Sequence, residues 1–169
     1  MSELVEILIG DGYAASPKRI LEGLVDGHGS DALTHRKPAG APHSIYEELW
    51  HVVFWQQITL DWISCNETPY PKRSLDGFPT VLDMETESFG ALCDRFFKGL
   101  NAAVEAANDI ARHDRKIRCT SRSSQPVRTM TVLEQLENLA AHNAYHLGRI
   151  VLLRQLLGTW PPPSGGDSW

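Results

Sequence analysis

Several features that would place this chain in a broad class are missing from its sequence. No apolar run approaches the roughly 20 residues that a membrane-spanning helix requires. The net charge is −5 and no basic block occurs, so nucleic acid is not an expected partner. The N-terminus, MSELVEILIGDG, carries acids where a signal peptide carries Lys or Arg. These absences predict a cytoplasmic protein that binds neither membranes nor nucleic acids.

Cysteine is also scarce. The three cysteines, Cys65, Cys93 and Cys119, are odd in number and lack CxxC spacing, which argues against a disulfide framework or a zinc ribbon. Cys65 and Cys93 fall within helical patterns, where each is expected to be a small buried hydrophobic residue.

What the sequence does contain is helical periodicity. Its 169 residues, 42% of them hydrophobic, suit one domain spanning residues 1–169 with a single core. Apolar residues recur at spacings of three and four, and no strand pattern competes, in four stretches: 2–25 (broken near residues 10–12), 44–65, 84–111 and 131–157. Gly, Pro or polar residues predict connections at 26–42, 66–82 and 112–128. The expected fold is all-α, a four-helix bundle with long inter-helix loops.

Two of these stretches begin with a capping box. Ser44 with Glu47, and Thr131 with Glu134, have the S/T-x-x-E spacing in which hydroxyl and carboxylate each accept a backbone N–H. Gly158 suits the position just past a helix end. These signals fix the start of the second helix and both ends of the fourth.

Two histidines stand four residues apart in the last helical stretch, within HNAYHLGRI. Positions i and i+4 share a helix face, so His142 and His146 can converge on one metal ion. Seven histidines among 169 residues would give roughly 0.3 such pairs by chance, so the spacing alone is weak evidence. Both residues nevertheless continue an inward apolar stripe between Leu139 and Ile150, where a polar group without a partner costs about 1–3 kcal/mol.

A third imidazole, His51, lies in the apolar helix EELWHVVFW, and facing helices of a bundle are where metal sites assemble. The residues alone leave two interpretations open: a metal site, or core histidines satisfied by hydrogen bonds. The other histidines are expected elsewhere. Surface loops are predicted for His28, His35 and His113, and His43 is expected at the entry of its helix, away from His51.

The segments HSIYEELWHVVFWQ and HNAYHLGRIVLLRQLLG resemble the DinB/YfiT-like superfamily of metal-dependent enzymes, and the helix order agrees over most of the chain. The resemblance implies an up-down-down-up bundle in which 66–82 crosses over between parallel helices. It also implies that His51, His142 and His146 bind one divalent ion, nickel or zinc, and that the chain forms a homodimer. Arg149 stands where several members have Gln.

The resemblance further implies a function. The leading hypothesis is a metal-dependent enzyme, a low-molecular-weight-thiol S-transferase that acts on small electrophiles and uses the thiol as cosubstrate. A nearby alternative is a metal-dependent hydrolase that uses metal-bound hydroxide as its nucleophile. A third is a non-catalytic metal-binding or dimerisation bundle.

Five further residues are candidates for the surroundings of the site. Glu47 and Asn138 each precede a histidine by one turn and can orient its free ring nitrogen, although capping is the expected role of Glu47. Gln135 is expected to line a pocket. Tyr145 and Arg149 either contact substrate or lie along the edge of the core.

The C-terminal segment TWPPPSGGDSW is rich in Pro and Gly. Residues 161–169 are expected to be either a disordered end or a tail whose Trp160 and Trp169 fold back onto the bundle or a dimer partner.

Overall fold

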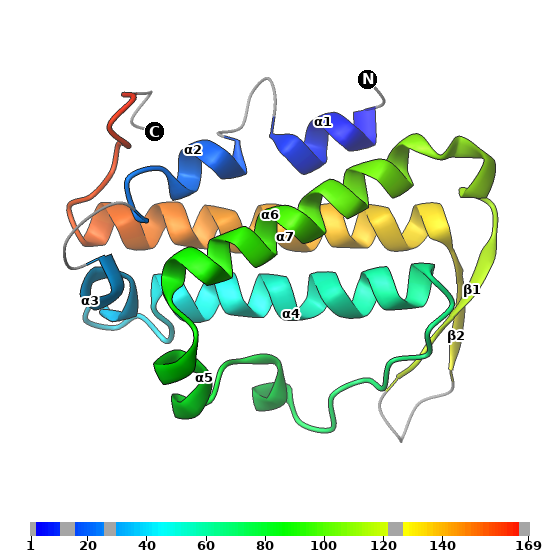
Figure 1. The fold of residues 1–169 in the computed structure, drawn as a ribbon, viewed down its shortest axis with the longest axis horizontal. Helices are drawn as coiled ribbons and strands as arrows, with labels where there is room; N and C mark the ends of the chain where they lie inside the picture. Colours follow the sequence, from blue (N-terminus) through cyan, green and yellow to red (C-terminus); the bar gives the residue numbers. More distant parts are fainter. Residues whose placement is uncertain (1–2, 11–15, 26–29, 122–126, 166–169) are drawn as a thin grey trace.

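The computed structural model describes residues 3–10, 16–25, 30–121 and 127–165 (Figure 1). Its elements in chain order are α1 (Glu3–Ile9), α2 (Pro17–Leu21), α3 (Ser30–His35), α4 (Ile45–Ile63), η1 (Ser74–Gly77), α5 (Val81–Thr86), α6 (Phe89–Asn108), η2 (Ile110–Arg112), β1 (Lys116–Cys119), β2 (Arg128–Thr131) and α7 (Val132–Leu156). No helix in these ranges is long and apolar enough to cross a bilayer.

The long helices α4, α6 and α7 pack with α1 and α2, which share the fourth position of the bundle (Figure 1). Helices α4 and α6 run in the same direction, whereas α7 and the α1–α2 pair run the opposite way (Figure 1). The predicted up-down-down-up four-helix bundle is confirmed. The core between the helices contains fully buried side chains from each, including Leu8, Leu49, Phe96, Leu136 and Ile150.

The predicted helix ends are present. The Ser44 hydroxyl accepts the Glu47 N–H while the Glu47 carboxylate accepts the Ser44 N–H at 2.7 Å. Thr131 and Glu134 form the same reciprocal pair at the start of α7. Gly158 has a φ of +70°, which glycine adopts without steric cost. Local side-chain chemistry therefore sets the length and phase of the two helices that carry the histidines.

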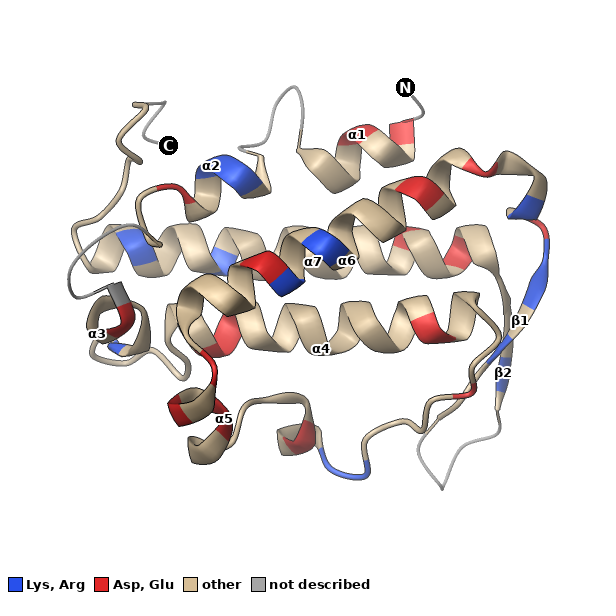
Figure 2. Ribbon diagram, viewed as in Figure 1, with Lys and Arg blue, Asp and Glu red and all other residues tan. Residues whose placement is uncertain are grey.

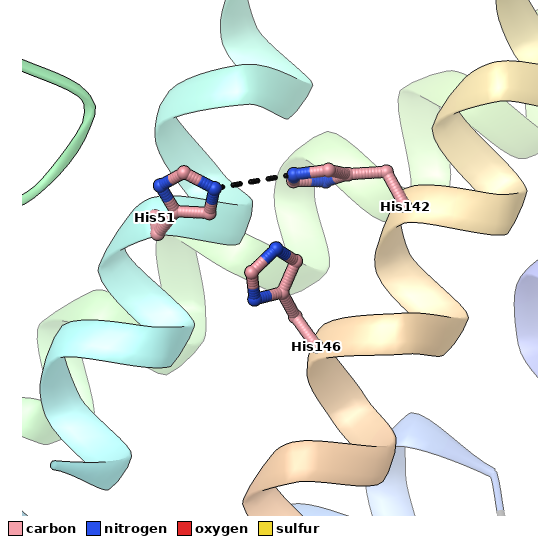
Figure 3. Close-up of side chains that lie close together, drawn as sticks. All are labelled: His51, His142 and His146. Carbon is pink, nitrogen blue, oxygen red and sulfur yellow. Dashed lines mark hydrogen bonds between the residues drawn. The ribbon is translucent and has the colours of Figure 1, made fainter. Parts of the chain in front are cut away.

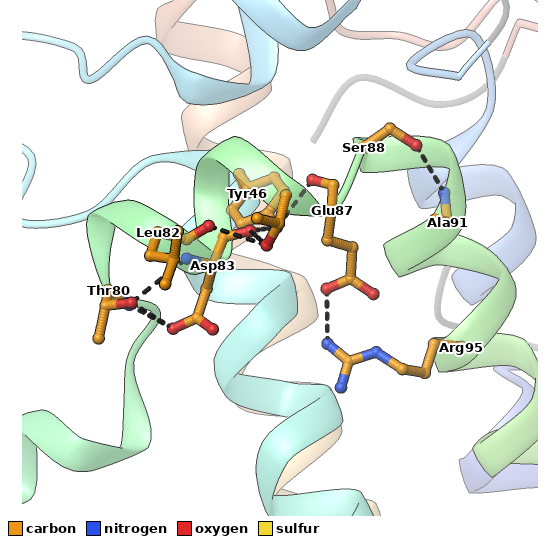
Figure 4. Close-up of polar contacts among 9 residues, drawn as sticks. Tyr46, Thr80, Leu82, Asp83, Glu87, Ser88, Ala91 and Arg95 are labelled. Atoms are coloured by element: carbon orange, nitrogen blue, oxygen red, sulfur yellow. Dashed lines mark hydrogen bonds and ion pairs between the residues drawn. The ribbon is translucent and has the colours of Figure 1, made fainter.

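The third helix was predicted as one unit from residue 84 to 111, and this is wrong. The chain forms α5, an extended Glu87, and then α6, which ends at Asn108. The break arises because Ser88 caps α6 by accepting the Ala91 N–H, and Glu87 pairs with Arg95 at 2.7 Å (Figure 4). The Tyr46 hydroxyl donates to the Glu87 carbonyl at 3.1 Å, which ties this break to the start of α4 (Figure 4).

Two predicted connections contain regular structure. The segment 112–128 was expected to be a polar loop, yet it contains β1 and the first residue of β2, which pair antiparallel with Lys116 opposite Thr131. Strand β1 is only four residues long, and its residues alternate between exposed and buried. An alternation this short is too weak to predict a strand within a basic segment. The 26–42 segment contains α3, whose His35, expected on the surface, is half-buried and packs against Tyr46 with ring centroids 4.4 Å apart. His28 lies outside the described residues.

Residues 159–165 pack against the bundle. Arg154, only 2% exposed, donates to the carbonyls of Ile20 and Thr159 and lies 5.3 Å from the Trp160 ring centroid. The Ser164 hydroxyl bonds Glu22. The tail thus folds back onto α2 as far as it is described; Trp169 lies outside the described residues. Cys65, predicted to be buried, is exposed because α4 ends at Ile63.

Candidate metal centre

Three imidazoles from two facing helices converge on one point. His51 comes from the middle of α4, and His142 and His146 come from adjacent turns of α7 (Figure 3). One nitrogen from each ring lies within 4.8 Å of the other two. The Nε2 atoms of His51 and His142 are 3.3 Å apart. The structure therefore brings together all three histidines singled out in the sequence.

The ring of His51 is oriented by the crossover between α4 and α6. Its Nδ1 lies 2.7 Å from the carbonyl oxygen of Gly77, which can only accept, so Nδ1 carries the proton and Nε2 presents its lone pair. Phe78 stacks on the same ring at a centroid distance of 4.3 Å. His43, at the entry of α4 as expected, stacks on the same Phe78 ring at 4.0 Å.

A buried carboxylate orients His146. The Nδ1 of His146 lies 2.7 Å from an oxygen of Glu48, which is 0% exposed. The other oxygen of Glu48 pairs with the Arg149 guanidinium at 2.7 Å. Because the carboxylate accepts, Nδ1 of His146 donates and its Nε2 is left for a ligand. Glu48 therefore joins His146 on α7 to Arg149, one turn further along the same helix.

Burial favours the neutral form of the His51 and His142 rings. It lowers the pKa of His51 to about 4, an effect that the Gly77 hydrogen bond only partly offsets. Burial, followed by the proximity of His146 and His51, lowers the pKa of His142 to about 3. The Nδ1 of His142 is buried without a hydrogen-bond partner among the described residues. Both rings are therefore neutral near pH 7, each with one N–H and one lone pair, which is the state in which imidazole binds metal.

This donor set fits a divalent metal ion. Two imidazoles on one tetrahedral ion, each bound at about 2.0–2.1 Å, hold their nitrogens roughly 3.3 Å apart, and the two Nε2 atoms of His51 and His142 lie at 3.3 Å. The same contact is a hydrogen bond when His142 carries its proton on Nε2 and His51 accepts it (Figure 3), and an ion bound there would take the place of that proton. The carbonyl and carboxylate behind two of the rings are partners typical of metal-bound histidines.

The other predicted residues fall into two groups. Glu47 caps α4 and pairs with Lys37 at 2.8 Å, without a hydrogen bond to any histidine. Gln135 and Asn138 line a cavity, and Asn138 forms no hydrogen bond with His142. The remaining two, Tyr145 and Arg149, lie at the outer edge of the site, where the guanidinium donates to the tyrosine oxygen at 3.1 Å.

Glu48 and Gly77 were missed by the sequence reasoning. The signal for Glu48 was present, because it lies on the buried side of an apolar helix and the capping box already accounts for its neighbour Glu47. No local signal exists for Gly77, since a backbone carbonyl contributed by a loop depends on tertiary packing alone.

A cavity of about 410 Å³ opens beside the histidine cluster. It reaches His142 at one side, and its described lining is aromatic and polar: Trp55, Thr59, Trp62, Tyr70, Arg128, Gln135, Asn138 and Leu139. This volume accommodates a small organic molecule.

The fold is an up-down-down-up four-helix bundle, and three imidazoles converge between α4 and α7. These two features together define a class of candidate metalloproteins. A family model described as the DinB superfamily matches residues 18–150. The chain belongs to the DinB superfamily. Comparisons with curated proteins and with solved structures gave no match.

Proposed function

We propose that this protein is a divalent-metal-dependent enzyme, a low-molecular-weight-thiol S-transferase acting on small electrophiles. His51, His142 and His146 would hold the ion, nickel or zinc, and the cavity beside His142 would hold the substrate. One observation supports this most strongly: the three ring nitrogens lie within 4.8 Å of one another at the edge of an open cavity. Three neutral ligands leave a coordination position free, as in catalytic zinc sites.

The residues of the chain have separable tasks in this proposal. Gly77 and Glu48 keep the protons of His51 and His146 on Nδ1 and so direct Nε2 inward. Arg149 compensates the charge of Glu48. When bound, the ion would supply Lewis-acid chemistry, lowering the pKa of a coordinated thiol or water.

The chain itself supplies no obvious nucleophile among the described residues. Burial raises the pKa of Cys93 to about 12 and raises that of Cys119 as well, so neither is a thiolate near neutral pH. Cys65 is exposed at the end of α4, far along the helix from His51. We infer that a cosubstrate thiol or a water molecule brings the nucleophile; the resemblance to the family puts thiol transfer first, with hydrolysis as the alternative.

Metal analysis and turnover assays test the proposal together. Purified protein should contain close to one divalent ion per chain, and His51→Ala and His142→Ala should lose it. The metal-loaded protein should conjugate a thiol such as cysteine or glutathione to haloaromatic or epoxide electrophiles. Ester hydrolysis without conjugation would favour the hydrolase. Metal binding with no turnover in either panel would leave a non-catalytic metal-binding bundle.

We also propose a homodimer. The outer face of α7 exposes Tyr145, Leu152 and Leu156, which are 60%, 54% and 58% exposed. These apolar side chains share one side of the helix and are suited to contact a second copy. Light scattering should give twice the mass of the chain, and Leu152→Glu should give the monomer mass; a monomeric parent protein contradicts the proposal.

A further inference from the structure

The cavity beside His142 carries an unusual distribution of charge. Arg128 is the only charged side chain among the described residues that line it. Its guanidinium forms no hydrogen bond or ion pair with any residue the structure describes. Arg128 belongs to the β1–β2 hairpin, whose other cations include Lys116 and Arg118 (Figure 2). No described carboxylate lines the cavity, so its field favours an anion.

The wall between Arg128 and the histidine cluster is aromatic. The rings of Trp55 and Tyr70 lie 5.0 Å apart, and Trp55 meets His142 edge-on at a centroid distance of 6.5 Å. The loop that carries Tyr70 is held in place because the Trp62 indole N–H and the Thr120 hydroxyl both donate to the Thr68 carbonyl, at 2.9 and 2.7 Å. A planar group can therefore rest against a fixed aromatic surface.

Polar groups on the opposite side are available to a ligand. The amide of Asn138 has no hydrogen-bond partner among the described residues that line the cavity. Gln135 makes only long contacts, with its Nε2 3.4 Å from the Thr59 hydroxyl and its Oε1 3.7 Å from the Cys119 sulfur. Such groups orient a ligand without supplying net charge.

We infer that this cavity binds a small monocarboxylate with a planar, unsaturated or aromatic body. Arg128 takes the carboxylate, Trp55 and Tyr70 contact the planar body, and the other end of the molecule faces His142. One guanidinium matches one carboxylate in a two-point hydrogen bond. The inference rests on the proposed function in one respect only: the end of the ligand that faces His142 would contact the metal ion.

Binding of cinnamate and its neutral analogue cinnamamide to the full chain tests this, by ligand-observed NMR titration in EDTA. Cinnamate should bind about tenfold more tightly than cinnamamide, as expected for a charge-assisted hydrogen bond. Arg128→Gln should abolish that preference without weakening cinnamamide binding. The matched control Lys116→Gln removes a cation from the same hairpin outside the cavity, and should keep the preference. Tyr70→Leu should weaken both probes alike.

Three results would each overturn the inference. They are equal affinity for cinnamate and cinnamamide, the same preference for cinnamate in Arg128→Gln as in Lys116→Gln, and no binding of either probe up to about 10 mM. Because the titration is made without metal, its result is independent of the proposed enzyme activity. His51→Ala, which should abolish metal binding, should retain the preference for cinnamate. A protein that binds cinnamate selectively but never turns over would contradict the proposed function and leave this inference standing.

Discussion

The carboxylate of Glu48 lies completely buried between two cationic or proton-bearing groups, 2.7 Å from Nδ1 of His146 and 2.7 Å from the guanidinium of Arg149. A buried carboxylate of this kind is expensive unless both oxygens have partners. A hydrophobic residue would fill the same space at a lower cost in free energy. We therefore infer that the role of the Glu48 carboxylate is to orient the His146 ring.

Replacing Glu48 should therefore weaken the metal site. We expect Glu48→Gln to lower the affinity for Zn²⁺ or Ni²⁺ by about 10–100-fold, because the hydrogen bond that orients His146 loses its charge. Competition with a chromophoric chelator measures this. Glu47→Gln is the matched control, since the neighbouring glutamate caps the helix and does not touch a histidine; equal losses in the two variants would contradict the role of Glu48.

Metal should stabilise the folded chain. An ion that binds only the native state adds about 2.7 kcal/mol at a hundred times its dissociation constant. Thermal denaturation with EDTA and with added Zn²⁺ should show this difference in the parent protein and none in His142→Ala. Loss of all secondary structure in EDTA would instead identify the ion as a structural requirement of the bundle.

The packing of α6 against α4 depends on the missing side chain of Gly99. A Cβ there would lie 2.0 Å from Nε2 of Gln56, whose amide is buried and donates to the Phe96 carbonyl at 2.9 Å. We expect Gly99→Ala to lower the free energy of unfolding by about 1–3 kcal/mol through loss of that hydrogen bond. Urea denaturation in EDTA measures it.

Gly148 provides the control for this substitution. It also lies inside a helix, but a Cβ there meets nothing within 4 Å. Gly148→Ala should raise the free energy of unfolding by about 0.5–1 kcal/mol, the ordinary helix preference for alanine. Stabilisation by both substitutions would show that Gln56 moves aside freely.

Alkaline pH should destabilise the protein through Cys93. Burial raises the pKa of this thiol from 9.0 to about 12 in the folded chain. The folded state therefore holds a proton that the unfolded state releases, so the stabilisation is complete below pH 9 and is lost as the pH rises toward 12. The expected slope is up to about 1.4 kcal/mol per pH unit.

Comparing the pH dependence of urea unfolding for the parent protein and Cys93→Ala isolates this contribution. The variant should lack that part of the slope above pH 9, whatever its stability at neutral pH. Cys65→Ala, at an exposed position, should leave the slope unchanged. An identical slope in all three proteins would show that the Cys93 thiolate is solvated in the native state.

The features that the sequence predicted well are those decided within one turn of helix. The capping boxes at Ser44 and Thr131 and the i, i+4 spacing of His142 and His146 need no knowledge of distant contacts. The features it predicted poorly depend on packing. Tyr46 joins the break before α6 to α4 by donating to the Glu87 carbonyl, and the Gly77 carbonyl meets His51 from a loop 26 residues further along the chain.

That crossover also bears on how the protein could diversify. Parallel α4 and α6 require a long connection across the bundle, and here the same connection supplies Gly77 and Phe78 at the histidines and Tyr70 at the cavity. The three histidines lie on helices, as do seven of the nine described residues that line the cavity; the crossover adds Tyr70 and the β1–β2 hairpin adds Arg128. Substitutions at Tyr70 can therefore alter the cavity wall alone, whereas insertions or deletions that displace Gly77 and Phe78 would also disturb the orientation of the His51 ring.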